Sequence, residues 1–174
     1  MYNSARIITK GKKEFKFGRI DIRAKLPEGQ GIWPALWMLG SNIDDVGWPT
    51  CGEIDIMEMV GHEPNKTHGT AHWRASDGNS TFKGASTSSS KKLSEQYHVY
   101  SILWEENSLN WYFDEEKFHT ITPNNLQNVE FPFNQNFFFI FNIAVGGIWP
   151  GNPDDTTVFP QEMEIDYIRV FQEK

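Results

Sequence analysis

Three carboxylates within one short apolar stretch constrain this chain more than any other feature of its sequence. The stretch is GEIDIMEMVG, residues 52–61, in which isoleucine and methionine separate Glu53, Asp55 and Glu58. Apolar, partly β-branched residues favour a strand, whose side chains alternate between two faces. Glu53 and Asp55 therefore share a face, whereas strict alternation would bury Glu58, at a high cost for an unpaired carboxylate. One extra residue, a β-bulge for which Met57 is the natural candidate, would return Glu58 to the acidic face.

Length and composition fit a globular domain and argue against nucleic acid or an anionic membrane as partner. The chain has 174 residues, enough for one domain with a sizeable core, and its formal net charge is −7. It contains no apolar run of the roughly 18 residues that predict a transmembrane helix. The single cysteine, Cys51, excludes an internal disulfide framework. The 7 tryptophans are more than a core of this size requires, and flat aromatic faces suit stacking on sugar rings.

Hydrophobic patterning predicts about ten strands and no convincing helix. The clearest alternation lies in residues 14–26, which predicts a long antiparallel strand with one wet face. The continuous apolar run FFFIFNIAV, residues 137–145, is typical of a strand covered on both faces. The Ser-, Gly- and Lys-rich residues 74–96 predict a mobile loop. We therefore predict an all-β fold in one domain, residues 1–174: a β-sandwich of the jelly-roll type with a concave cleft.

A hairpin should place a second strand beside the acidic one. Residues 67–73, THGTAHW, follow after a short turn and are expected to pair with the acidic strand in antiparallel fashion. His72 would then lie near the level of the carboxylates. Alone, such a histidine is more often structural than catalytic, but here it could hydrogen-bond a sugar or a carboxylate.

Two carboxylates on one strand face suit glycoside hydrolysis, in which one protonates the leaving oxygen and the other attacks carbon or activates water. On a flat strand with one bulge, the Cα atoms of Glu53 and Glu58 would be ~13 Å apart at about 3.4 Å per step. A retaining mechanism needs carboxyl groups about 5 to 5.5 Å apart, so the hypothesis requires a curved sheet. Asp55 between them could hold a shared proton and raise the pKa of the acid. Calcium ligation and a merely solvated strand face are the alternatives.

The motif resembles the active-site motif of glycoside hydrolase family 16, in the bulged form of its laminarinases. Four further segments support the resemblance in the same order along the chain: SARIITKGKKEFKFGRIDIRAKLPEGQGIWPALWMLG, HGTAHW, NIAVGGIWPGNP and FPQEMEIDYIRVF. The resemblance implies a concanavalin A-like jelly roll and an endo-acting, retaining β-1,3-glucanase. Mixed-linkage glucan and agarose- or carrageenan-type galactans are the rival substrates, and a β-glucan-binding module with weak or no catalysis is the rival function.

The resemblance also assigns roles to individual residues. Glu53 is expected to be the nucleophile, Glu58 the general acid/base, and Asp55 an assisting group between them. The residues at positions where family members line the cleft are Trp33, Trp37, Trp48, His72, Trp73, Asn142 and Trp149. No cofactor is implied for catalysis, but family members often bind one structural calcium, partly through an aspartate in the last strand, which is Asp166 here.

The resemblance further implies β-glucan polysaccharide as the partner and an extracellular or periplasmic location. Family members usually carry an additional segment before the point where this chain begins, so the resemblance predicts an N-terminally shortened domain. A missing strand would expose sheet edges and apolar surface, which predicts an oligomer or a complementing chain.

Overall fold

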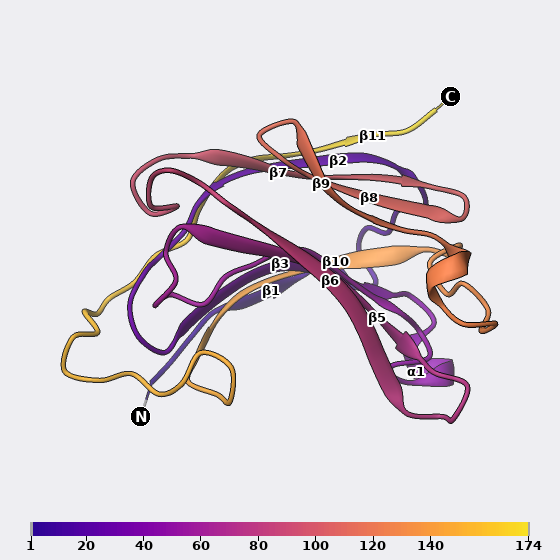
Figure 1. Cartoon of the computed structure of the whole chain (residues 1–174), viewed down its shortest axis with the longest axis horizontal. Helices are drawn as coiled ribbons and strands as arrows, with labels where there is room; N and C mark the ends of the chain where they lie inside the picture. Colours follow the sequence, from indigo (N-terminus) through magenta and orange to yellow (C-terminus); the bar gives the residue numbers. More distant parts are fainter. Residues whose placement is uncertain (1, 174) are drawn as a thin grey trace.

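Two antiparallel sheets packed face to face make up most of the structure, a computed structural model that describes residues 2–173 (Figure 1). The strands are β1 (Arg6–Ile8), β2 (Gly18–Lys25), β3 (Ile32–Gly40), β4 (Glu53–Glu58), β5 (Lys66–Arg74), β6 (Ser80–Ser88), β7 (His98–Glu105), β8 (Ser108–Phe113), β9 (Glu116–Ile121), β10 (Phe137–Val145) and β11 (Glu164–Phe171). One sheet has the order β1-β10-β3-β4-β5-β6, and the other has the order β11-β2-β7-β8-β9. The predicted all-β sandwich is confirmed.

The core between the sheets is built from the inward faces of the strands. Along β2 the apolar positions Ile20, Ile22 and Ala24 are fully buried, while the charged positions between them form the outer face. β11 is the neighbour of β2 in the sheet, and ion pairs join the two strands on this outer face. One of them links Arg23 Nη1 and Asp166 Oδ2 at 2.6 Å. The alternation of residues 14–26 therefore identified the core face correctly, because one side of this antiparallel strand meets water.

The prediction of a loop over residues 74–96 is wrong for residues 80–88. These residues form β6, which pairs with β5 along its whole length, from Lys66–Ser88 to Arg74–Ser80. β6 is one of the two edge strands of its sheet, and most of its side chains are exposed. An edge strand held by backbone hydrogen bonds to one neighbour needs little apolar content, so its composition looks like that of a loop.

The acidic strand β4 lies in the middle of the six-stranded sheet and contains the predicted bulge. In the register with β3, Met57 lies opposite Leu36 and Asp55 lies opposite Trp37, so Ile56 is skipped. In the register with β5, Asp55 pairs with Thr70 and Glu58 with His68, so Ile56 and Met57 share the single opposite residue Gly69. The extra residue changes the alternation and brings Glu58 to the same face as Glu53.

The connections of the six-stranded sheet enclose its outer face on two sides. In Figure 1 the tip of the β5–β6 hairpin and the loop after β10 both project below this sheet, away from the five-stranded sheet. Among residues 2–173 the helical elements are α1 (Ile43–Val46) and a 3-10 turn, η1 (Pro123–Asn125). Within the described part of the chain, neither element approaches the length and apolarity that a membrane-crossing helix needs.

Candidate active site

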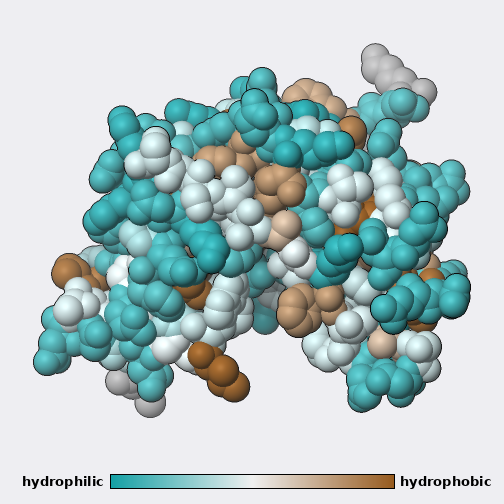
Figure 2. Space-filling view, viewed as in Figure 1, coloured by the Kyte–Doolittle hydropathy of each residue, from teal (hydrophilic) through white to brown (hydrophobic). Residues whose placement is uncertain are grey.

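The carboxylates of β4 face an open groove on the outer side of the six-stranded sheet. The groove has a volume of about 580 Å³ and draws its walls from β3, β4, β5, β6 and the loop after β10. Its lining residues are Trp33, Glu53, Glu58, His68, Thr70, His72, Phe82, Gly84, Ala85, Ser86 and Trp149. In Figure 2 a hollow is visible in the lower edge of the molecule, between the loop after β10 and the tip of the β5–β6 hairpin.

Glu53 is the carboxylate with the most groups that stabilise its ionised form. Trp48 Nε1 donates a hydrogen bond to Glu53 Oε2 at 2.7 Å, and His72 Nε2 lies 3.8 Å from Glu53 Oε1. Burial raises the pKa of Glu53, while His72, the Trp48 indole and a hydrogen bond from Asp55 act in the opposite direction. Glu53 is therefore suited to carry the negative charge of the group.

Asp55 is almost completely buried, with 2% of its surface exposed. Burial, and then the negative charge of Glu53, raise the pKa of Asp55 well above its usual range. Its Oδ2 lies 3.1 Å from His72 Nε2. Asp55 is thus the carboxyl that retains a proton, and it can donate this proton in a hydrogen bond to Glu53.

Glu58 lies at the other end of the strand, with fewer groups to stabilise a charge. Burial, and then the nearby Asp55, raise the pKa of Glu58 well above its usual value. Trp33 Nε1 donates a hydrogen bond to Glu58 Oε1 at 3.1 Å, which opposes this shift only in part. Burial thus raises the pKa of both carboxyls, but that of Glu58 is raised further because fewer groups stabilise its charge. Acid-assisted nucleophilic catalysis requires a difference of this kind between two carboxyls.

Aromatic rings stand at both ends of the acidic row. Near Glu58, the Trp149 ring centroid lies 5.3 Å from that of Trp33 and 5.0 Å from that of His68. Near Glu53, the His72 ring lies between Trp48 and Phe82, at 6.4 and 5.4 Å. Such apolar ring faces, next to a few polar groups that fix orientation, are typical of a ligand groove.

The predicted groove residues on β3 and β10 divide into two sets. Trp33 lines the groove directly, as do the predicted His72 and Trp149. Trp37 and Asn142 are not part of the groove lining; Trp37 Nε1 donates to Asn142 Oδ1 at 2.7 Å, and the Arg6 guanidinium lies 5.2 Å from the Trp37 ring. Trp37 and Asn142 extend the outer face of the sheet toward its β1 edge.

The prediction that Trp73 lines the cleft is wrong. Trp73 is 4% exposed and belongs to the hydrophobic core between the sheets. Because His72 and Trp73 are neighbours on the regular strand β5, they point to opposite faces and cannot both reach the groove.

Phe82, His68 and Thr70 were not predicted to line the groove. His68, Thr70 and His72 occupy every second position of β5, so strand alternation applied to His72 alone would have found the other two. Phe82 lies opposite His72 on β6, a strand that the composition concealed.

The described residues do not support a calcium site at Asp166. The Asp166 carboxylate forms an ion pair with Arg23, so a guanidinium occupies the position that a calcium ion bound to Asp166 would take. Within residues 2–173, no group of three His, Cys, Asp or Glu ligand atoms includes Asp166. One such group does form, from Glu53, Asp55 and His72, and it lies at the carboxylates of the groove.

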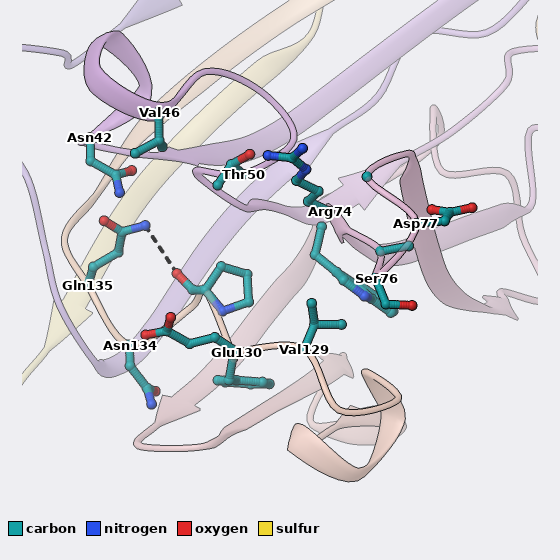
Figure 3. A pocket seen from close by; sticks show the side chains of 15 residues that line it. Asn42, Val46, Thr50, Arg74, Ser76, Asp77, Val129, Glu130, Asn134 and Gln135 are labelled. Atoms are coloured by element: carbon teal, nitrogen blue, oxygen red, sulfur yellow. Dashed lines mark hydrogen bonds between the residues drawn. The ribbon is translucent and has the colours of Figure 1, made fainter.

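A larger cavity, about 680 Å³, lies beside α1 and the β5–β6 turn (Figure 3). Arg74, Glu130 and Asn42 are among its lining residues, and none of the three carboxylates of β4 is. Gln135 uses its amide to hold the Pro132 carbonyl at 3.2 Å, the bond drawn in Figure 3, and the Cys51 carbonyl at 2.9 Å. The two carboxylates that line this cavity, Asp77 and Glu130, are both exposed, so we place the chemistry at the buried carboxylates of the groove over β4.

Comparisons with known proteins agree with this placement. The family model described as glycosyl hydrolases family 16 matches residues 1–169. A β-glucanase of Rhodothermus marinus is 39% identical over 98% of this chain and 63% of its own length. Glucan endo-1,3-β-glucosidase A1 of Niallia circulans is 38% identical over 99% of this chain and 27% of its own length, so the chain spans less than two thirds of either relative. The laminarinase catalytic domain of Thermotoga maritima superposes with a TM-score of 0.89 at 50% identity, covering 97% of this chain and 69% of that one.

Proposed function

The chain belongs to glycosyl hydrolase family 16, and from this premise we propose that it cleaves internal bonds of laminarin-type β-1,3-glucan with retention of configuration. The named relatives act on β-glucans, and the groove over β4 is open and lined by aromatic rings, as an internal segment of a polysaccharide requires. An extracellular or periplasmic location, where such polymers are found, belongs to the same proposal.

The mechanism assigns one task to each carboxylate. Glu53 attacks the anomeric carbon, while Glu58 gives its proton to the leaving glycosidic oxygen, so that a covalent glycosyl–Glu53 intermediate forms as the glycosidic bond breaks. Glu58, now ionised, removes a proton from water, and the resulting attack on the anomeric carbon releases Glu53. Asp55 holds its proton toward Glu53 and stabilises the negative charge there before the first step and again after the second, when Glu53 is released.

The single observation that carries this proposal is the contrast between the two ends of β4. Glu53 is contacted by the Trp48 indole and His72, which favour its charge, whereas burial holds the pKa of Glu58 well above its usual value and favours its protonated form. A solvated strand face would not keep its carboxyls buried or separate their environments in this way.

The test is the release of reducing ends from borohydride-reduced laminarin by the native chain and by Glu53→Gln. We expect early release of mixed oligosaccharides from the native chain and no release above background from the variant, because an amide cannot act as the nucleophile. Mixed-linkage glucan, agarose and carrageenan in parallel reactions rank the substrates. Equal rates for the native chain and Glu53→Gln would contradict the assignment, and laminarin binding without product from the native chain would favour the binding module.

A further inference from the structure

One buried indole of the five-stranded sheet contacts the backbone of the acidic strand. Trp111, on β8, has no exposed surface, and its Nε1 donates a hydrogen bond to the main-chain carbonyl oxygen of Asp55 at 2.8 Å. Asp55 is the residue immediately before the bulge. A bulge disturbs the regular ladder of hydrogen bonds, and a buried carbonyl needs a partner. The indole provides one from the opposite side of the sandwich.

The same indole also requires the residue opposite the bulge to be glycine. Gly69 on β5 faces Ile56 and Met57 together. A Cβ atom at position 69 would lie 2.4 Å from Trp111 Cδ1 and 2.9 Å from Trp111 Nε1. The Trp111 ring therefore occupies the space that a side chain at position 69 would fill, and it packs against His119 at a centroid distance of 5.0 Å. Ring and glycine fit together only while the two strands keep this register.

We propose that Trp111 is a positioning residue for the catalytic pair: through the Asp55 carbonyl it fixes the bulge that turns Glu58 into the groove. Without the bulge, Glu58 would follow the alternation of Ile54 and Ile56 toward the core. The consequence for catalysis rests on the proposed function, whereas the consequence for the environment of Glu58 does not.

The chain contains a matched control. Trp104, on β7 of the same sheet, is equally buried, and its Nε1 also donates to a main-chain carbonyl at 2.8 Å, that of Phe133. Trp111→Phe and Trp104→Phe each remove one buried indole–carbonyl hydrogen bond and keep an aromatic ring. Only the first of these bonds reaches β4, so a merely structural role predicts the same outcome for both variants.

The experiment measures laminarin kinetics and the carboxyl NMR titration of Glu58 in the native chain and both variants. We expect Trp111→Phe to lower kcat by about tenfold or more with KM within about twofold, since small displacements of reacting groups are costly. We also expect the pKa of Glu58 to rise further above its usual value, because a relaxed bulge turns this carboxyl toward the core. Trp104→Phe should keep both properties at similar thermal stability.

Equal losses in the two variants, or an unchanged Glu58 titration in Trp111→Phe, would overturn the proposal. If the native chain releases no sugar, the proposed function fails, and the NMR titration still decides whether Trp111 positions Glu58. If Trp111→Phe does not fold, 3-benzothienylalanine at position 111 keeps the ring shape and replaces only the N–H group, and the same two outcomes apply.

Discussion

Each of the outer carboxylates of β4 has its own indole donor, so the pKa of each depends on a different tryptophan. Trp48 donates to Glu53 at 2.7 Å, and Trp33 donates to Glu58 at 3.1 Å. A hydrogen bond to an ionised carboxylate favours the charged form and lowers its pKa. The two limbs of the pH–rate profile should therefore depend on different tryptophans.

Replacing these tryptophans by phenylalanine should move opposite limbs of the profile of kcat/KM against pH. In Trp48→Phe the pKa of Glu53 rises, so the acidic limb, where Glu53 must lose its proton, moves to higher pH. In Trp33→Phe the pKa of Glu58 rises, so the alkaline limb, where Glu58 must keep its proton, moves to higher pH. Initial rates on laminarin across the pH range measure both, and movement of the same limb in both variants would refute the separate assignment.

The proton on Asp55 has a consequence for stability. Because burial raises the pKa of Asp55 in the folded chain, the folded state binds more protons than the unfolded state above the ordinary pKa of an aspartate, and stability falls as pH rises through that window. Asp55→Asn removes this cost and keeps a group that can donate to Glu53. We expect Tm at neutral pH to rise by about 2–4 °C for each kcal/mol regained.

The gain from Asp55→Asn should disappear in acid, below the ordinary pKa of an aspartate, where both states of the native chain carry the proton. Calorimetry at several pH values measures the difference in Tm between the two proteins. A gain of equal size at acid and neutral pH would show that titration of Asp55 is not its source.

At the scale of single strands, side-chain alternation explains why the bulge in β4 could be predicted and why Trp73 was misplaced. The alternation in β4 required a bulge to bring Glu58 to the groove, and the structure has one, formed by Ile56 together with the predicted Met57. The same rule applied to β5 would have placed Trp73 in the core, where it lies, but the family resemblance assigned it to the cleft. β6 could not be predicted because an exposed edge strand has no apolar pattern.

The opposite positions of Trp73 and Trp149 should separate stability from substrate binding. Trp73 is buried in the core, so Trp73→Ala should cost about 3–5 kcal/mol of unfolding free energy, as is usual for large core side chains. Trp149 is 40% exposed in the groove, so Trp149→Ala should cost less than about 1 kcal/mol but raise KM for laminarin. Denaturant unfolding and initial rates distinguish the two, and a comparable loss of stability in both variants would contradict the assignment of faces.

For the whole molecule, the sandwich positions β4 by two different means. Within the six-stranded sheet, β3 and β5 set its register, and from the opposite sheet the Trp111 indole reaches the Asp55 carbonyl. The all-β class and the core face of β2 could be predicted because local alternation encodes them. The contact of Trp111 with β4 joins residues 56 positions apart across two sheets, and no local pattern contains it.

The most direct test of the central claim is the configuration of azide products formed by Glu53→Ala and Glu58→Ala from an activated aryl β-laminaribioside. If Glu53 is the nucleophile, azide takes its place in Glu53→Ala and gives the α-glycosyl azide. If Glu58 is the acid/base, azide in Glu58→Ala attacks the glycosyl–Glu53 intermediate and gives the β-glycosyl azide. NMR of the anomeric proton distinguishes the two. The same anomer from both variants, or the reverse assignment, would contradict the roles given to the two ends of β4.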